Sequence, residues 1–213
     1  MWSWGIVAAA ALGLLYMVGR ARGARSGIGV LKPIPIVLLA VLVASEPAPI
    51  AEGYRWLVLA ALVCSMAGDV WLLFPDRFFV AGLASFLVAH LLYIGAFVPG
   101  GGWDVRAWAL LAPFALTGLG MLTALWPHLG GDRGPVMLYV AAIVVMGWRA
   151  AARAAAPVSA PSGTVALAGA VLFMISDGLL AVDRFARRSR AADTAVMGTY
   201  YTAQTLLALS VRG

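Results

Sequence analysis

The stretch "CSMAGDVWLLFPDRF", residues 64–78, is apolar enough to lie in a membrane, yet it contains Asp69 before the apolar run has ended. A charged side chain at the centre of a bilayer costs about 2.5–3.5 kcal/mol on insertion scales. Such a residue is expected to face a partner or a cavity inside a helix bundle, and not the lipid. The stretch therefore predicts a membrane helix with a buried polar centre.

The composition of the whole chain agrees with this interpretation. Of 213 residues, 63% are hydrophobic and 11% are charged, and the mean hydropathy is +0.94. A soluble domain is roughly 45–50% apolar and about 25% charged. The composition therefore predicts a polytopic membrane protein. The net charge of +6 comes from short connections between apolar runs, a pattern that sets membrane orientation and implies no nucleic-acid partner.

Eight apolar segments follow one another with turn-rich separators between them. They are predicted as helices at about 2–19, 30–44, 54–74, 78–98, 107–126, 135–152, 163–182 and 193–211. A helix needs about 20 apolar residues to cross a bilayer core, and the second segment is the shortest. The first lacks a positive region before it, so it is interpreted as a membrane helix and not as a signal peptide. We expect an all-α bundle of eight transmembrane helices that forms a single domain over 1–213.

The distribution of arginines predicts the orientation of this bundle. Nine lie after the odd-numbered segments: Arg20, Arg22, Arg25, Arg77, Arg133, Arg184, Arg187, Arg188 and Arg190. Five lie on the other side: Arg55, Arg106, Arg149, Arg153 and Arg212. Positive loops stay in the cytoplasm, so both termini are expected outside it. Because Ala, Gly and Arg are abundant, we expect a multi-pass protein of a bacterial inner membrane.

A second aspartate lies in a similar context. "MAGDVWLLFPDRF" (66–78) aligns with "MISDGLLAVDRF" (174–185) after one gap, which matches Asp69 with Asp177. The two segments are four spans apart and cross the membrane in the same direction. This pattern is typical of a parallel internal repeat in which four helices are followed by four equivalent helices. The alternative is a chance similarity between two short apolar segments.

Matched depth gives the two aspartates a possible chemical use. Each precedes its Asp-Arg-Phe turn by six or seven residues, about 10 Å of helix. Two carboxyl groups that face one cavity of low dielectric constant cannot both ionise cheaply, so one is expected to stay protonated. A protonated and an ionised carboxyl group together suit general acid–base catalysis. The alternative is two unrelated polar contacts between helices.

Other polar residues lie on neighbouring spans. His90 and Tyr93 share one helix face, as do Tyr200 and Gln204, and Tyr139 lies about one turn inside the membrane. These positions favour a polar pocket shared with the aspartates. Arg149 lies near a helix end, where a long side chain is expected to reach the membrane surface. No Cys/His metal-ligand spacing occurs, so no metal or other cofactor is expected.

Six sequence segments, taken together in their order along the chain, resemble the YhhN family of membrane proteins. The segments are "LKPIP" (31–35), "GDVWLLF" (68–74), "RFFVAGLASFLVAHLLYIGAF" (77–97), "PVMLYVAAIVVM" (135–146), "GAVLFMISDGLLAVDRF" (169–185) and "TYYTAQTLL" (199–207). The resemblance implies an eight-helix fold and, from the animal members, hydrolysis of the vinyl-ether bond of lysoplasmalogens without a cofactor. The polar residues that it carries over are Lys32, Asp69, His90, Tyr93, Tyr139, Ser176, Asp177, Tyr200 and Gln204.

This chemistry suits two carboxyl groups. A vinyl ether is hydrolysed by protonation of its β-carbon and by addition of water to the resulting oxocarbenium ion, which needs an acid and a carboxylate. In this hypothesis Asp69 and Asp177 are catalytic and the other residues bind the lysophospholipid. Lys32 is expected to meet its phosphate.

Two other classes of function remain open. Intramembrane Asp, His and Tyr residues together with a repeat are also typical of a proton-coupled transporter. An intramembrane aspartyl protease is disfavoured, because "SMAGD" departs from the GxGD spacing and no PAL triplet is present.

Overall fold

The computed structural model describes residues 2–22, 28–99, 102–156, 161–186 and 190–212. Within these ranges the regular secondary structure is helical, and a single isolated bridge joins Pro49 to Arg212. The long helices are α1 (Trp2–Ala21), α2 (Ile34–Ala44), α3 (Glu52–Trp71), α4 (Pro75–Phe97), α6 (Leu111–Leu125), α7 (Arg133–Ala155), α8 (Ser162–Phe185) and α9 (Arg190–Leu209). The all-α prediction is confirmed.

Six helical segments of the described chain are long and apolar enough to cross a membrane: α1, α3, α4, the segment 105–128, α7 and α8. This confirms the class of polytopic membrane protein. Helix α2 has 11 residues, and α9 has 20 with Asp193 in its first turn. That these two also span the membrane, for a total of eight, stays a prediction.

Prolines account for the differences between the predicted and observed helices. The predicted second segment divides into a 3₁₀ turn, Ile28–Leu31, and α2, with Pro33 and Pro35 at the junction. The predicted fifth divides at Leu110 into α5 (Val105–Ala109) and α6, because Pro113 has no N–H to donate to the carbonyl of Ala109. The other predicted segments agree with the helices to within three residues at either end.

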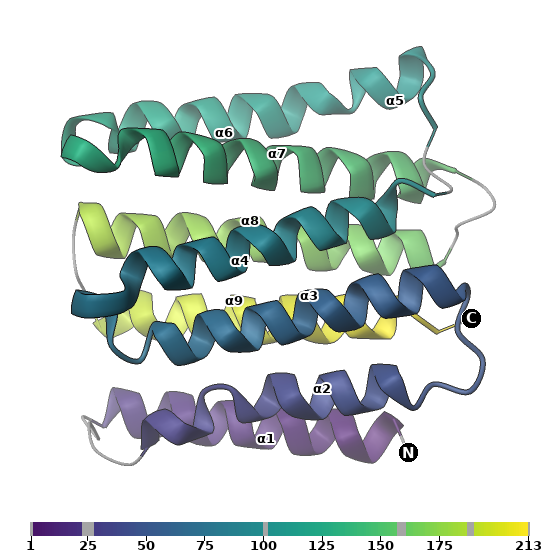
Figure 1. The fold of residues 1–213 in the computed structure, drawn as a ribbon, viewed down its shortest axis with the longest axis horizontal. Helices are drawn as coiled ribbons and strands as arrows, with labels where there is room; N and C mark the ends of the chain where they lie inside the picture. Colours follow the sequence, from purple (N-terminus) through teal and green to yellow (C-terminus); the bar gives the residue numbers. More distant parts are fainter. Residues whose placement is uncertain (1, 23–27, 100–101, 157–160, 187–189, 213) are drawn as a thin grey trace.

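The long helices run side by side along one axis (Figure 1). Both chain ends lie at one end of the bundle, and α1, α3, α6 and α8 end at the other (Figure 1). We call this second end the turn end. The prediction that it faces the cytoplasm stays a prediction, and Arg25, Arg187 and Arg188, which contribute to it, lie outside the described residues.

Small residues allow the helices to pack closely. A Cβ atom on Gly68 would lie 2.6 Å from the ring of Phe86, where α3 meets α4. A Cβ atom on Gly169 would lie 2.8 Å from Leu207 and 3.1 Å from the carbonyl oxygen of Ala203, where α8 meets α9. Apolar side chains gain little by leaving lipid, so such close backbone packing is a main source of attraction between membrane helices.

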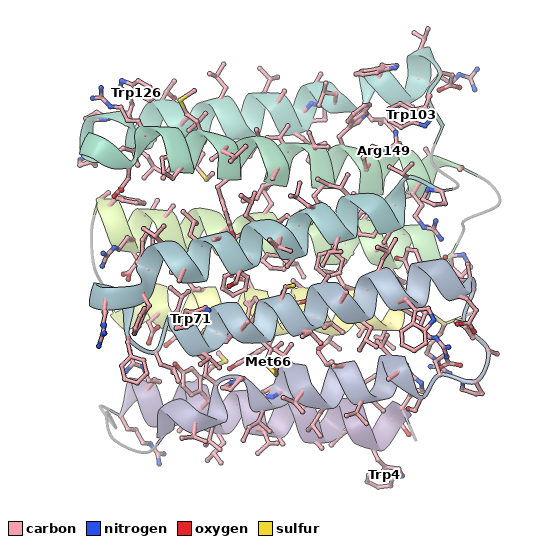
Figure 2. The ribbon with its side chains drawn as sticks, in the orientation of Figure 1. Trp4, Met66, Trp71, Trp103, Trp126 and Arg149 are labelled. Carbon is pink, nitrogen blue, oxygen red and sulfur yellow. The ribbon has the colours of Figure 1, made fainter. Side chains whose placement is uncertain are left out.

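Tryptophans lie toward both ends of the bundle. Trp4 and Trp103 lie toward the end that holds the termini, and Trp71 and Trp126 lie toward the turn end (Figure 2). All four side chains are exposed, from 39% for Trp71 to 80% for Trp4. Exposed tryptophans at both ends are typical of the aromatic belts at the two surfaces of a bilayer.

Candidate active site

The first polar centre is built around Asp69, near the end of α3. Its side chain is buried, with the residue 1% exposed. The ammonium of Lys32 lies 3.3 Å from Oδ1, and the hydroxyl of Tyr200 on α9 donates to Oδ2 at 2.8 Å. Both oxygens of the carboxylate therefore have a partner, and one partner carries the compensating charge.

The interruption before α2 places Lys32 in this centre. Because Pro33 and Pro35 disturb the helix, the amide of Ile36 donates to the carbonyl of Pro33 at 3.1 Å. The carbonyl of Lys32 instead accepts from the hydroxyl of Tyr201 at 2.9 Å. The residue is thus fixed by its own backbone between α2 and α9.

This placement corrects the expected role of Lys32. A residue that meets a lipid phosphate would hold its ammonium at the membrane surface, yet Lys32 is buried, at 7% exposed, and paired with Asp69. The sequence does not predict this ion pair, because the two residues are 37 positions apart and lie in different predicted helices.

The second polar centre is built around Asp177, in the second half of α8. The hydroxyl of Tyr139 on α7 donates to Oδ2 at 3.1 Å, and Nε2 of His90 on α4 lies 3.2 Å from the same oxygen. Nδ1 of His90 lies 2.6 Å from the carbonyl oxygen of Phe86. A carbonyl only accepts, so Nδ1 is the donor of this hydrogen bond, and Nε2 is the ring nitrogen that lies toward Asp177.

Aromatic rings connect the two centres. The ring of Phe173 packs against Tyr200 at 5.7 Å and against His90 at 4.7 Å between centroids. Phe86 packs against Phe173 and Tyr200 at 6.2 and 5.8 Å. The structure thus brings Asp69 and Asp177 to opposite sides of one buried aromatic cluster, which we define as Phe86, Phe173 and Tyr200.

A cavity lies on the side of Asp177. It holds about 480 Å³ of empty space, partly open to the outside, between α4, α6, α7 and α8. Its lining is apolar, with Leu83, Phe86 and Ile143 among the lining residues, apart from Tyr139 and Asp177. Asp69 does not line it. The expectation of one cavity that contains both carboxyl groups is therefore corrected: Phe86 lines the cavity and covers Tyr200, the partner of Asp69.

Three further predicted site residues form their hydrogen bonds with partners other than the two carboxyl groups. Tyr93 donates to Oε1 of Gln204 at 2.6 Å, and both side chains are fully buried between α4 and α9. Ser176 donates to the carbonyl of Val196 at 3.0 Å and joins α8 to α9. In the structure these residues hold helices together, and a role in substrate binding stays a prediction for them.

Arg149 also differs from its expectation. It does not extend to the membrane surface but is 1% exposed. Its guanidinium lies 4.1 Å over the ring of Trp103, and Nη1 donates to the carbonyl of Gly102 at 3.1 Å. Trp103 and Arg149 lie together near the end of the bundle that holds the termini (Figure 2). Arg149 therefore fastens the connection before α5 onto α7.

The two centres have equivalent contacts, which supports the predicted repeat. Asp69 on α3 has one partner next to α2 and one on α9. Asp177 on α8 has one partner on α7 and one on α4. Exchanging α2 with α7, α3 with α8 and α4 with α9 converts one arrangement into the other. Each carboxylate thus has one partner from its own half of the chain and one from the other half.

Residues 28–211 match the profile of the YhhN family. The chain belongs to the YhhN family. This YhhN chain is 40% identical over 159 residues to the lysoplasmalogenase TMEM86B of Homo sapiens, a match that covers 74% of the chain and 64% of the relative. It is 33% identical over 192 residues to a lysoplasmalogenase of Mycobacterium bovis, which covers 85% and 70% respectively. No solved structure matches.

These relatives are longer than the match. The chain spans a little under two thirds of the length of several mammalian relatives that it matches, for example 63% of the lysoplasmalogenase TMEM86B of Mus musculus. The YhhN profile covers the breaks before α2 and α6, both aspartates and all their partners. The family resemblance inferred from the sequence motifs is therefore confirmed.

Proposed function

We propose that this YhhN protein is an ether hydrolase that cleaves the vinyl-ether bond of a lysoplasmalogen. The products are a fatty aldehyde and a glycerophospho-ethanolamine or -choline. The observation that carries the proposal is the carboxyl group of Asp177 on the wall of an apolar cavity inside a membrane bundle. The names of the relatives, lysoplasmalogenases of mammals and mycobacteria, support the same reaction.

In the proposed mechanism Asp177 is the acid. The vinyl ether occupies the cavity with its double bond at Asp177, which gives a proton to the β-carbon. The carbon bound to oxygen becomes an oxocarbenium ion, water adds to it, and the hemiacetal releases aldehyde and alcohol. In this proposal Asp177 carries the proton that is transferred, with Nε2 of His90 beside it, and a proton returns to its carboxylate from the added water. Tyr139, which donates to Oδ2, orients the carboxyl group.

Asp69 supplies the second carboxylate. The ammonium of Lys32 and the hydroxyl of Tyr200 both favour the ionised form of Asp69. The carboxylate of this ion pair accepts from Tyr200 of the aromatic cluster, so the negative end of the pair lies toward the cluster and favours the positive charge that develops on the substrate. The division of roles in this proposal is acid for Asp177 and electrostatic stabilisation for Asp69.

The test is aldehyde release by the purified protein in detergent, where no ion gradient exists. An enzyme should convert alkenyl-lysophospholipid to aldehyde with multiple turnovers and should leave the saturated alkyl analogue intact. Absence of aldehyde from a folded, monodisperse preparation would contradict the proposal.

A second candidate is a proton-coupled transporter, favoured by the equivalent contacts in the two halves of the chain. Such a protein would move protons with a substrate across the membrane of a sealed vesicle. Substrate-dependent acidification of proteoliposomes, without aldehyde, would support this alternative and exclude hydrolysis.

A further inference from the structure

The second Asp-Arg-Phe motif, 183–185, lies at the rim of the cavity, and its arginine is the feature that the reaction chemistry leaves unused. Leu180, Ala181 and Phe185 line the cavity together with Asp177. They lie three, four and eight positions after Asp177, so they share its face of α8. Arg184 lies seven positions after Asp177, and two turns of an α-helix bring it back to the same face.

The contacts of Arg184 confirm that it is at the rim. Its guanidinium lies 4.5 Å over the ring of Phe79, a cavity-lining residue near the start of α4. The same ring packs edge to face against Phe185 at 5.9 Å. All three residues lie at the turn end, where α8 ends and α4 begins (Figure 1). The cavity therefore has a cationic, aromatic rim and an apolar interior.

We propose that Arg184 binds the phosphate of a single-chain phospholipid whose glycerol segment and vinyl ether occupy the cavity. This inference rests on the proposed function and adds the head-group site to it. It replaces Lys32, whose ammonium is engaged with Asp69. An arginine presents a planar fork of N–H donors that suits phosphate oxygens and tolerates an aromatic ring beneath it.

The spacing along α8 fits such a lipid. Asp177 and Arg184 are seven residues apart, about 10 Å of helix rise. Seven covalent bonds separate the phosphorus of a lysoplasmalogen from the β-carbon of its vinyl ether. At ordinary bond lengths, the extended distance between these two atoms is on the order of 9 Å. A phosphate at Arg184 thus places the reactive carbon beside Asp177, which is the cavity-lining residue of α8 that lies farthest from Arg184.

The first Asp-Arg-Phe motif provides a matched control. Arg77 has the same place in its motif as Arg184, and its guanidinium also lies over a phenyl ring, that of Phe78 at 4.9 Å. Phe78 does not line the cavity, and Arg77 is exposed. The two arginines therefore share sequence context and ring contact, and they differ in proximity to the cavity.

The experiment measures equilibrium binding to purified protein in nanodiscs made of uncharged lipid. The probes are a saturated alkyl-lysophosphatidylethanolamine, which is not hydrolysed, and a fatty aldehyde of equal chain length, which has no phosphate. Arg184→Gln should weaken binding of the lysophospholipid by about 10- to 100-fold, the factor expected for a hydrogen bond to a charged group, and should leave aldehyde binding unchanged. Arg184→Lys should recover part of the loss, and Arg77→Gln should bind both probes normally.

Three outcomes would overturn the proposal. Equal losses for lysophospholipid and aldehyde would mean that Arg184 only shapes the cavity. Unchanged lysophospholipid binding would exclude it from the head-group site, and equal affinity for inorganic phosphate would indicate a site for the free ion. Failure of the proposed function is distinguishable: wild-type protein would then bind the alkyl probe but release no aldehyde from the alkenyl substrate.

Discussion

At the scale of single residues, the two carboxylates differ in their environment more than their matched motifs indicate. Asp69 is compensated by the full charge of Lys32, whereas Asp177 meets a histidine and a phenol. Because Nδ1 of this histidine is engaged by the carbonyl of Phe86, its Nε2 is the ring nitrogen that lies toward Asp177. The same residue type therefore has two different electrostatic environments next to one aromatic cluster.

We expect Asp177→Asn to lower the rate of aldehyde release by about 10² to 10⁴, because asparagine keeps the shape but gives no proton. Asp69→Asn should lower the rate by a similar factor through loss of the fixed charge. Asp193→Asn is the control, since the side chain of Asp193 is only partly buried and forms an ion pair with the exposed Arg20. Near-normal turnover in both Asp69→Asn and Asp177→Asn would refute a two-aspartate mechanism.

The pair of Lys32 and Asp69 makes a separate prediction about stability. Lys32→Met leaves the carboxylate of Asp69 buried without its counter-charge, so we expect a loss of about 3–5 kcal/mol in the free energy of unfolding. The double variant Lys32→Met/Asp69→Asn should recover much of this loss. The check is denaturant unfolding in detergent for the two single variants and the double variant. Additive losses would show that the two side chains do not interact.

At the scale of helices, proline breaks and close glycine contacts position the site. The break at Pro33 exposes a backbone carbonyl to Tyr201, and the contact between Gly68 and Phe86 sets the distance of α3 from α4. Phe86 then serves three features at once, because it lines the cavity, covers Tyr200 and accepts from His90 through its carbonyl. Helix spacing and site geometry are therefore coupled.

Gly169→Ala should destabilise the contact of α8 with α9. The added methyl would lie 3.1 Å from the backbone oxygen of Ala203, which cannot rotate away, so we expect a cost of about 1–3 kcal/mol. Gly120→Ala on α6 is the matched control, because nothing lies within 4 Å of the place that its added methyl would take and alanine favours a helix. Thermal unfolding should rank Gly169→Ala below wild type and Gly120→Ala at or above it.

Ala181→Phe tests whether the substrate occupies the cavity. Ala181 lines the cavity between Asp177 and Arg184, so a phenyl ring there should take the space of the glycerol segment. We expect kcat/KM to fall at least about tenfold for long-chain and short-chain lysoplasmalogens alike. Ala168→Phe, on the same helix at an exposed position, should leave kcat/KM unchanged. An unaltered kcat/KM in Ala181→Phe would contradict a substrate in this cavity.

At the scale of the whole molecule, both termini lie at one end of the bundle, as an even number of crossings requires (Figure 1). The charge distribution predicts that this end lies outside the cytoplasm. A C-terminal alkaline phosphatase fusion in bacterial cells should therefore be active, and a C-terminal fluorescent protein that folds only in the cytoplasm should be dark. The reverse pair of results would invert the topology and move Arg184 and the cavity rim to the outer leaflet.

The membrane class, the helical fold and the positions of most helix ends could all be predicted from the sequence. These depend on local quantities: apolar run length, proline positions and the composition of the turns. The sequence also indicated that Asp69, Asp177, His90, Tyr139 and Tyr200 belong to one buried region, because isolated ionisable groups are too costly in lipid. The order of the motifs along the chain was sufficient to recognise the YhhN family.

Which of these residues contact each other became clear only from the packed bundle. The pairing of Lys32 with Asp69, the division of the two carboxyl groups by the aromatic cluster and the burial of Arg149 all join residues that lie far apart in the chain. Helical periodicity gives the direction in which a side chain points around the axis of its helix. It does not give the rotation and spacing of neighbouring helices relative to that helix. Those depend on side-chain packing such as that of Gly68 against Phe86, which a single sequence does not encode in any local pattern.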